Sequence, residues 1–105
     1  MGSRDKLYTV IVSDRAADML LVHLRFIAQA SIEAADRLRM EIIEAVKFLE
    51  KFPDRNPWLS DPALPVNKYR KMVINKRYLI IYQIRGDLVF VEYVLDCRQN
   101  YKWLI

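Results

Sequence analysis

The feature that most constrains the fold is a pair of amphipathic helical segments joined by a link of only one or two residues. Ser13 and Asp14 offer an N-cap for a first helix that runs to about Gln29. Ser31 can cap a second helix, which should end at Phe52 because Pro53 cannot continue it. Since the link between the two is so short, we expect the helices to pack as an antiparallel hairpin.

The apolar stripes of the two helices are the candidate core, because side chains at helical spacing share one face. Leu21 and Val22 extend the apolar surface of the first helix beyond its stripe, so we expect another protein or a second copy of the chain to cover part of it. The residues expected to be buried against a sheet are Leu20, Leu24, Ile27, Leu38, Ile42, Val46 and Leu49, with Ile43 and Ala45 flanking the second stripe.

The remaining segments have the composition of β-strands, with one strand before the helices and three after them. Asn75-Lys76 and residues 85–87 suit tight turns, which predicts that the last three strands form a meander. All four prolines lie between Pro53 and Pro65, and this predicts a loop pinned by Trp58 and Leu59. The expected strands are Leu7–Ser13, Tyr69–Ile74, Arg77–Ile84 and Leu88–Leu95.

These elements predict one α+β domain spanning residues 1–105, with the helical hairpin across one face of the sheet. Residues 1–6 are polar and charged, and we expect them to be disordered or to derive in part from cloning. The start of the chain lacks the pattern of a signal peptide, and no apolar stretch approaches the ~18 residues needed to cross a bilayer. We therefore expect a cytoplasmic protein without a membrane contact, and the unpaired Cys97 agrees with a reducing compartment.

The composition excludes several kinds of catalytic site. His23 and Cys97 are the only histidine and cysteine, which is too few for a zinc site of nitrogen and sulfur ligands. His23 lies at helical spacing among apolar residues, so we expect it to be a packed or half-exposed residue of the helix. No second histidine is then available to activate Cys97. Two glycines are too few for a phosphate-binding loop. We expect no metal and no cofactor.

The excess of positive over negative charge is confined to the second part of the chain. Of the net charge of +4, residues 1–66 contribute −1 and residues 67–105 contribute +5. A small basic sheet that also carries tyrosines suits an anionic partner such as RNA, DNA or an acidic peptide. The alternative is that these lysines and arginines only solvate an exposed face and protect the sheet edges.

Four segments of the C-terminal half form a pattern through their order and spacing: Tyr69–Val73, Arg77–Ile84, Gly86–Val91 and Val94–Tyr101. Together they resemble the RelE/ParE superfamily of toxins from type II toxin–antitoxin systems. The helical hairpin and Lys51-Phe52-Pro53 continue this resemblance upstream, so that it covers about residues 7–101. It implies a toxin of the plasmid-stabilisation type, neutralised by a cognate antitoxin.

The superfamily contains two activities. RelE-like members cut messenger RNA on the ribosome without a metal and leave a 2′,3′-cyclic phosphate, whereas ParE-like members poison DNA gyrase. On the RelE reading, Arg70, Arg98 and Tyr101 would be the catalytic residues. However, Met72 and Leu79 occupy positions at which the RelE pattern has basic residues.

Arg77 could partly replace the missing charge, because strand alternation puts it on the same face as Leu79, although ~7 Å further along the strand. We therefore favour a ParE-like toxin or one with an undetermined target. The alternatives are a RelE-type ribosome-dependent endonuclease with an altered site, and a non-toxic module on the same scaffold that binds nucleic acid or protein.

The basic residues near the end of the chain are the candidate surface for the target. If they act together, Arg70, Arg77 and Arg98 should converge within roughly 8–10 Å on the open face of the sheet. The alternative arrangement pairs them with Glu92 and Asp96. The candidate target-binding residues are Lys68, Lys71, Arg77, Lys102 and Trp103.

Overall fold

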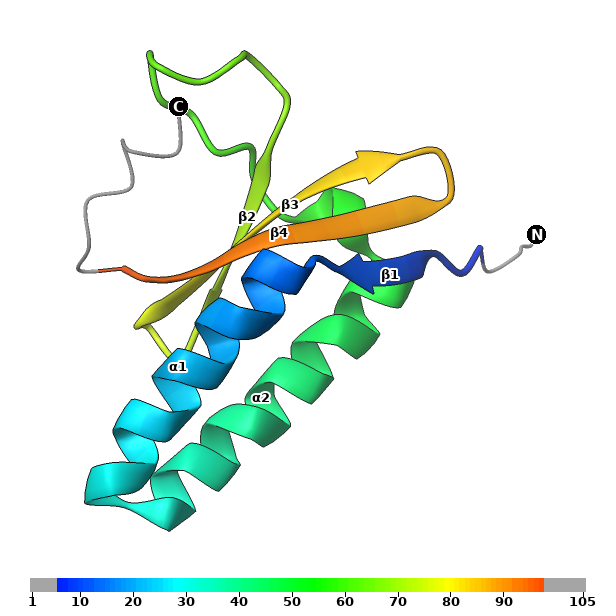
Figure 1. Cartoon of the computed structure of the whole chain (residues 1–105). Helices are drawn as coiled ribbons and strands as arrows, with labels where there is room; N and C mark the ends of the chain where they lie inside the picture. Colours follow the sequence, from blue (N-terminus) through cyan, green and yellow to red (C-terminus); the bar gives the residue numbers. More distant parts are fainter. Residues whose placement is uncertain (1–5, 98–105) are drawn as a thin grey trace.

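The structure, a computed structural model, describes residues 6–97 of the chain. A strand and two long helices are followed by a short 3₁₀ helix and three further strands, as Figure 1 shows. The expected order of elements is confirmed, and their ends differ from the expected ones by a few residues at most. The elements are β1 (Thr9–Val12), α1 (Asp14–Ala30), α2 (Ile32–Lys51), η1 (Pro53–Arg55), β2 (Arg70–Ile74), β3 (Tyr78–Arg85) and β4 (Leu88–Asp96).

The four strands form one mixed sheet in the order β1-β4-β3-β2. Strands β2, β3 and β4 form the expected antiparallel meander, and β1 pairs parallel to β4, with Thr9 opposite Leu88. The register of β3 and β4 shifts between Ile81 and Tyr82, where β4 contributes an extra residue. The first strand of the chain thus lies beside the last one.

Both helix caps form as the sequence predicts. The Ser13 hydroxyl accepts a hydrogen bond from the Ala16 amide, and the Ser31 hydroxyl accepts one from the Ala34 amide, each at 3.0 Å. Lys51 is the last residue of α2, and Phe52, the C-cap, separates it from the proline that begins η1. The two helices form the expected hairpin, which covers one face of the sheet and extends beyond it (Figure 1). The α+β fold class is therefore confirmed.

The first core lies between this hairpin and the sheet. Leu38 and Leu49 are buried in it, and Ile42 packs against it, as the helical spacing predicts. Val46 was expected in the same stripe, but Ala45 is the buried residue and Val46 is only half-buried. An alanine side chain needs less space between α2 and the sheet than a valine side chain, so Ala45 can occupy the inward position. The expected packing of the first helix is confirmed, since Leu20, Leu24 and Ile27 contact the core.

A second core lies on the opposite face of the sheet. The loop between η1 and β2 covers this face, with Leu59 buried at its centre. The amide of Leu59 donates to the Tyr69 carbonyl at 2.7 Å, and the Lys71 amide donates to the Pro57 carbonyl at 3.0 Å, so the loop also pairs with the edge of β2. This loop makes β3 a strand that is buried on both faces. The buried residues of this core are Leu59, Leu79, Ile81, Tyr93 and Leu95.

Helix α1 lies along the edge of β4 beyond the end of β1. The Ser13 amide donates to the Val91 carbonyl at 2.9 Å, and the Ser13 hydroxyl donates to the Glu92 carbonyl at 3.3 Å. Nearly three turns further on, His23 contacts the Val94 carbonyl. The expectation that His23 packs within the fold is confirmed. Helix α1 thereby satisfies edge carbonyl groups that a neighbouring strand would otherwise pair.

Candidate functional site

Arg70 begins β2 and is held by the loop that precedes the strand. Its Nη1 donates to the Asn56 carbonyl at 2.6 Å and to the Asp54 carbonyl at 3.3 Å. Its guanidinium carbon lies 3.8 Å from the centre of the Trp58 ring, a cation–π contact. The candidate catalytic arginine thus directs its charge at backbone carbonyls and an indole, and fastens the loop to the sheet.

Tyr82 belongs to the same corner, directly opposite Arg70 across β2 and β3. Its hydroxyl accepts a hydrogen bond from Asn56 Nδ2 at 3.0 Å and donates one to the Pro53 carbonyl. Burial raises the pKa of Tyr82 above its ordinary value. Asn56 therefore links Arg70 to Tyr82, and the corner is a polar network that holds η1 against the sheet. Sequence analysis did not find this network, because its members are distant in the chain.

The two positions that depart from the RelE pattern lie in different cores. Met72 packs from β2 against the core under the helical hairpin. Leu79 is 5% exposed and belongs to the core on the other face. The structure therefore uses both side chains for packing, and neither one adds a charge beside Arg70.

Arg77 lies next to the helical hairpin and not on the face of Leu79, so that expectation is wrong. Its Nε donates to Asp96 Oδ2 at 3.3 Å, and its guanidinium carbon is 5.3 Å from the Tyr78 ring centre. Together with Ala34, Arg77 lines two adjacent clefts, which have volumes of about 600 Å³ and 360 Å³. Strand alternation failed because β3 begins at Tyr78, which leaves Arg77 in the turn.

The structure does not bring Arg70 and Arg77 together. Arg70 lies opposite Tyr82, whereas Arg77 precedes Tyr78, so the two arginines are separated by about 16 Å along β3 at ~3.3 Å per residue. The expected convergence within 8–10 Å is therefore wrong for this pair. Instead, Arg77 pairs with Asp96, as the alternative arrangement predicted.

The candidate lysines differ in their surroundings. Lys68 is exposed, and its ammonium lies 5.1 Å from the centre of the Tyr69 ring. Lys71 is half-buried on β2, and its ammonium group interacts electrostatically with Cys97, the residue that follows β4. Burial raises the pKa of the Cys97 thiol, the Asp96 carboxylate raises it further, and the Lys71 ammonium acts in the opposite direction. The other candidates, Arg98, Tyr101, Lys102 and Trp103, lie outside the described residues.

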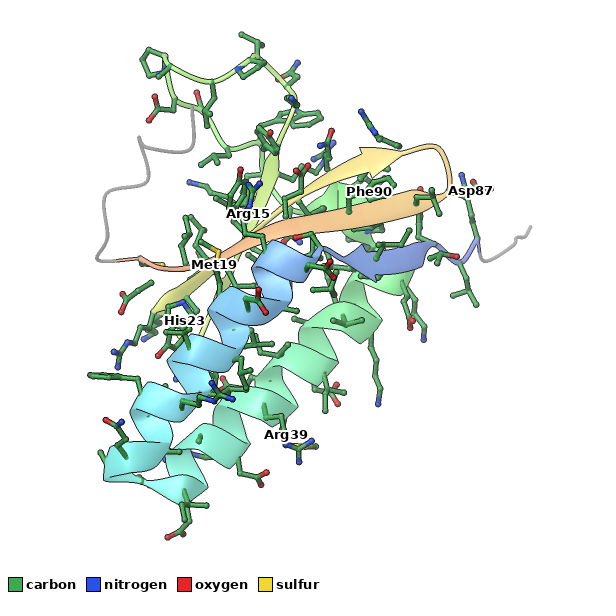
Figure 2. The ribbon with its side chains drawn as sticks, in the orientation of Figure 1. Arg15, Met19, His23, Arg39, Asp87 and Phe90 are labelled. Atoms are coloured by element: carbon green, nitrogen blue, oxygen red, sulfur yellow. The ribbon has the colours of Figure 1, made fainter. Side chains whose placement is uncertain are left out.

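One contact of α1 was not expected from the sequence. Helical spacing alone assigns Arg15 to the solvent face, but its guanidinium lies 4.8 Å from the Tyr93 ring centre and donates to the Tyr93 hydroxyl. Figure 2 shows Arg15, Met19 and His23 in a row along the side of α1 that faces β4. The spacing of four residues between them was the available signal.

Neither a metal site nor a membrane span is found in residues 6–97. No group of three or more histidine, cysteine, aspartate or glutamate side chains in this range could hold a metal ion. No helix in the same range is long and apolar enough to cross a membrane.

Comparisons with known proteins identify the family. A solved structure described as the chromosomal ParDE TA system from P. aeruginosa shares the fold, with a TM-score of 0.69 over 87% of this chain and 97% of that chain, at 14% sequence identity. No curated protein matches the sequence. The family model described as "ParE toxin of type II toxin-antitoxin system, parDE" matches residues 10–101. The resemblance seen in the sequence is thus confirmed, and the chain belongs to the ParE toxin family of type II toxin–antitoxin systems.

Proposed function

We propose that this ParE toxin arrests growth by binding a protein target, DNA gyrase, and that it does not cut RNA. The observation that carries the proposal is the state of Arg70. Its guanidinium contacts the Asn56 and Asp54 carbonyls and the Trp58 ring, so it is poorly placed to hold a phosphate group. Met72 and Leu79 add only apolar surface to the two cores.

The chemistry of RNA cleavage supports the same proposal. Metal-free cleavage needs groups that take a proton from the 2′-hydroxyl and give one to the leaving oxygen. Arginine is a poor proton donor, since its pKa lies far above neutral pH. His23 is engaged with the Val94 carbonyl, and Tyr82 is buried with its hydroxyl bonded. Neither His23 nor Tyr82 is therefore free to move a proton, and Arg70 could supply only charge stabilisation.

A cognate antitoxin of the ParD type is the partner that a ParDE system implies. We propose that it covers the apolar groove between α2 and β2, which encloses about 470 Å³. Val73 lies in this groove and is 53% exposed, and Glu41 and Glu44 lie at the same surface. The groove therefore fits an apolar segment with basic residues beside it. Both the antitoxin and gyrase are expected in the cytoplasm.

Two assays on the purified toxin separate the activities. We expect it to inhibit DNA supercoiling by gyrase, and we expect messenger RNA to stay intact when the toxin is added to translating ribosomes. Ribosome-dependent cleavage without any effect on gyrase would overturn the proposed target.

The partner is tested by expression with and without the small gene next to the toxin gene. We expect growth arrest from the toxin alone and growth in the presence of its antitoxin. Val73→Asp should weaken antitoxin binding, because it buries a carboxylate in the groove. The matched control is Val66→Asp, since Val66 is 89% exposed in the loop before β2 and outside the groove. Equal antitoxin affinity of the two variants would exclude this groove.

A second candidate function is binding of RNA at the loop side of the sheet. It is favoured by the exposed Lys68, which stacks on Tyr69, and by Lys71 on the next strand. Lys68→Ala and Lys71→Ala should then lower RNA affinity, most strongly at low salt. Unchanged RNA affinity in both variants would remove this candidate.

A further inference from the structure

The outward face of α1 carries an exposed strip that the fold itself does not cover. Leu21 and Val22 are 44% and 62% exposed, and Asp18 and Arg25 are exposed one turn to either side of them. Phe26 extends the apolar part of the strip next to Val22. The four ion pairs that join described residues involve neither Asp18 nor Arg25.

This strip is complementary to itself. Along the helix it reads acid, apolar, apolar, base, with the two charges seven residues apart on one side, or ~10.5 Å along the axis. If a second α1 is laid against it in the opposite direction, Asp18 meets Arg25 of the partner subunit at both ends. A two-fold axis between Leu21 and Val22 relates the two helices.

The charges also select the direction of the pair. In a parallel arrangement, Asp18 would face the partner's Asp18 and Arg25 would face the partner's Arg25, and like charges repel. In the antiparallel arrangement, both end contacts are favourable, and the apolar residues meet at the centre. There Leu21 packs against the partner's Leu21, and Val22 packs against the partner's Val22.

We propose that free toxin molecules associate as antiparallel dimers through the outward faces of α1. The interface is narrow, because one helix pair covers less than the roughly 1,200 Å² of the smaller stable interfaces. Association should therefore be weak and should depend on protein concentration. The groove between α2 and β2 does not belong to this surface, so the dimer does not rest on where the antitoxin binds.

Charge reversal tests the pairing in the full-length toxin, purified free of antitoxin and studied by sedimentation equilibrium. Asp18→Arg and Arg25→Asp should each raise the dissociation constant at least about tenfold, because each variant turns two attractive contacts into repulsive ones. The double variant D18R/R25D restores opposite charges and should recover most of the affinity. Circular dichroism checks that each variant keeps its helices. Wild-type toxin that stays monomeric at millimolar concentration, or a double variant no better than the single ones, would overturn the proposal.

Disulfide cross-linking tests the position of the two-fold axis. In a Cys97→Ser background, Val22→Cys places two thiols near the axis, within the ~7 Å between Cα atoms that a disulfide allows. Gln29→Cys is the matched control, because it is exposed on the same helix but lies about 22 Å from its counterpart by helical rise. We expect rapid oxidation to a covalent dimer only for the Val22 variant. Equal rates for the two variants would exclude the proposed axis.

Discussion

The Nε2 atom of His23 lies 3.0 Å from the carbonyl oxygen of Val94, on the part of the β4 edge that extends beyond β1 and that no strand covers in the described part of the chain. A carbonyl oxygen can only accept, so Nε2 carries the hydrogen and donates it. The imidazole also packs against the Tyr78 ring, with 5.1 Å between the ring centres. His23 thus fastens α1 to the sheet by a polar and an aromatic contact at once.

Removal of this contact should lower the stability of the fold. His23→Ala leaves the Val94 carbonyl without its donor and creates a gap beside Tyr78, so we expect a loss of ~1–3 kcal/mol in the free energy of unfolding. Urea denaturation measures it. Gln29→Ala, at an exposed position of the same helix, is the control and should change stability little. A His23 variant as stable as this control would show that the contact is not needed.

The turn between β2 and β3 contains a correctable strain. Asn75 and Lys76 have φ angles of +54° and +56°, in the left-handed region that glycine adopts most readily. Asparagine tolerates this region, whereas lysine does so at a cost. Lys76→Gly should therefore raise the free energy of unfolding by about 0.5–1 kcal/mol. Lys76→Ala removes the same charge without relieving the strain, so a similar gain from both variants would point to charge as the cause.

The helical hairpin could be predicted from the sequence because its signals are local. The Ser13 and Ser31 hydroxyls cap the helices by accepting hydrogen bonds from amides three residues further along the chain. The second helix ends two residues before Pro53, which cannot continue it. The meander was predicted for the same reason, since each of its turns joins neighbouring strands.

Contacts between distant segments carried no comparable signal. The position of β1 beside β4 depends on how the whole sheet assembles, which no local pattern specifies. Arg70 donates to backbone carbonyls in the preceding loop, up to 16 residues away. The resemblance to the RelE pattern assigned Arg70 to a catalytic position and therefore did not predict this structural role. Ala45 is buried where Val46 was expected, because helical spacing predicts the direction of the buried face only to within one residue.

The buried hydroxyl of Tyr82 predicts a loss of stability at alkaline pH. Burial raises the pKa of this phenol above the ordinary 10.0, so the folded protein holds the proton more tightly than the unfolded chain does. This stabilisation is complete below about pH 10 and is lost as the pH rises through the pKa of the folded state. Tyr82→Phe should flatten the decline, when thermal unfolding is followed between pH 8 and 11. It should also lower stability at pH 7 by roughly 1–2 kcal/mol, because the Pro53 carbonyl and Asn56 lose their partner. An unchanged alkaline decline in the variant would assign it to another group.

Variants of Arg70 can show whether this residue has a structural or a catalytic role. Arg70→Ala removes the cation–π contact with Trp58 and the donors to Asn56 and Asp54, so we expect the protein to lose ~1–3 kcal/mol of stability. Arg70→Lys keeps the charge but lacks the planar guanidinium, and should recover only part of the loss. Lys71→Ala, the next residue along β2, is the control for charge alone.

The growth phenotype then distinguishes the two roles. If Arg70 acts by holding the loop, Arg70→Ala should still arrest growth at a low temperature at which it remains folded, and it should lose this activity on warming. The measurement is growth arrest on expression at two temperatures, compared with the melting curve of each purified variant. A folded Arg70→Ala protein that fails to arrest growth at the low temperature would assign Arg70 to the target surface or to catalysis. It would then reopen the RelE reading of this corner, because a purely structural arginine loses its effect only when the structure is lost.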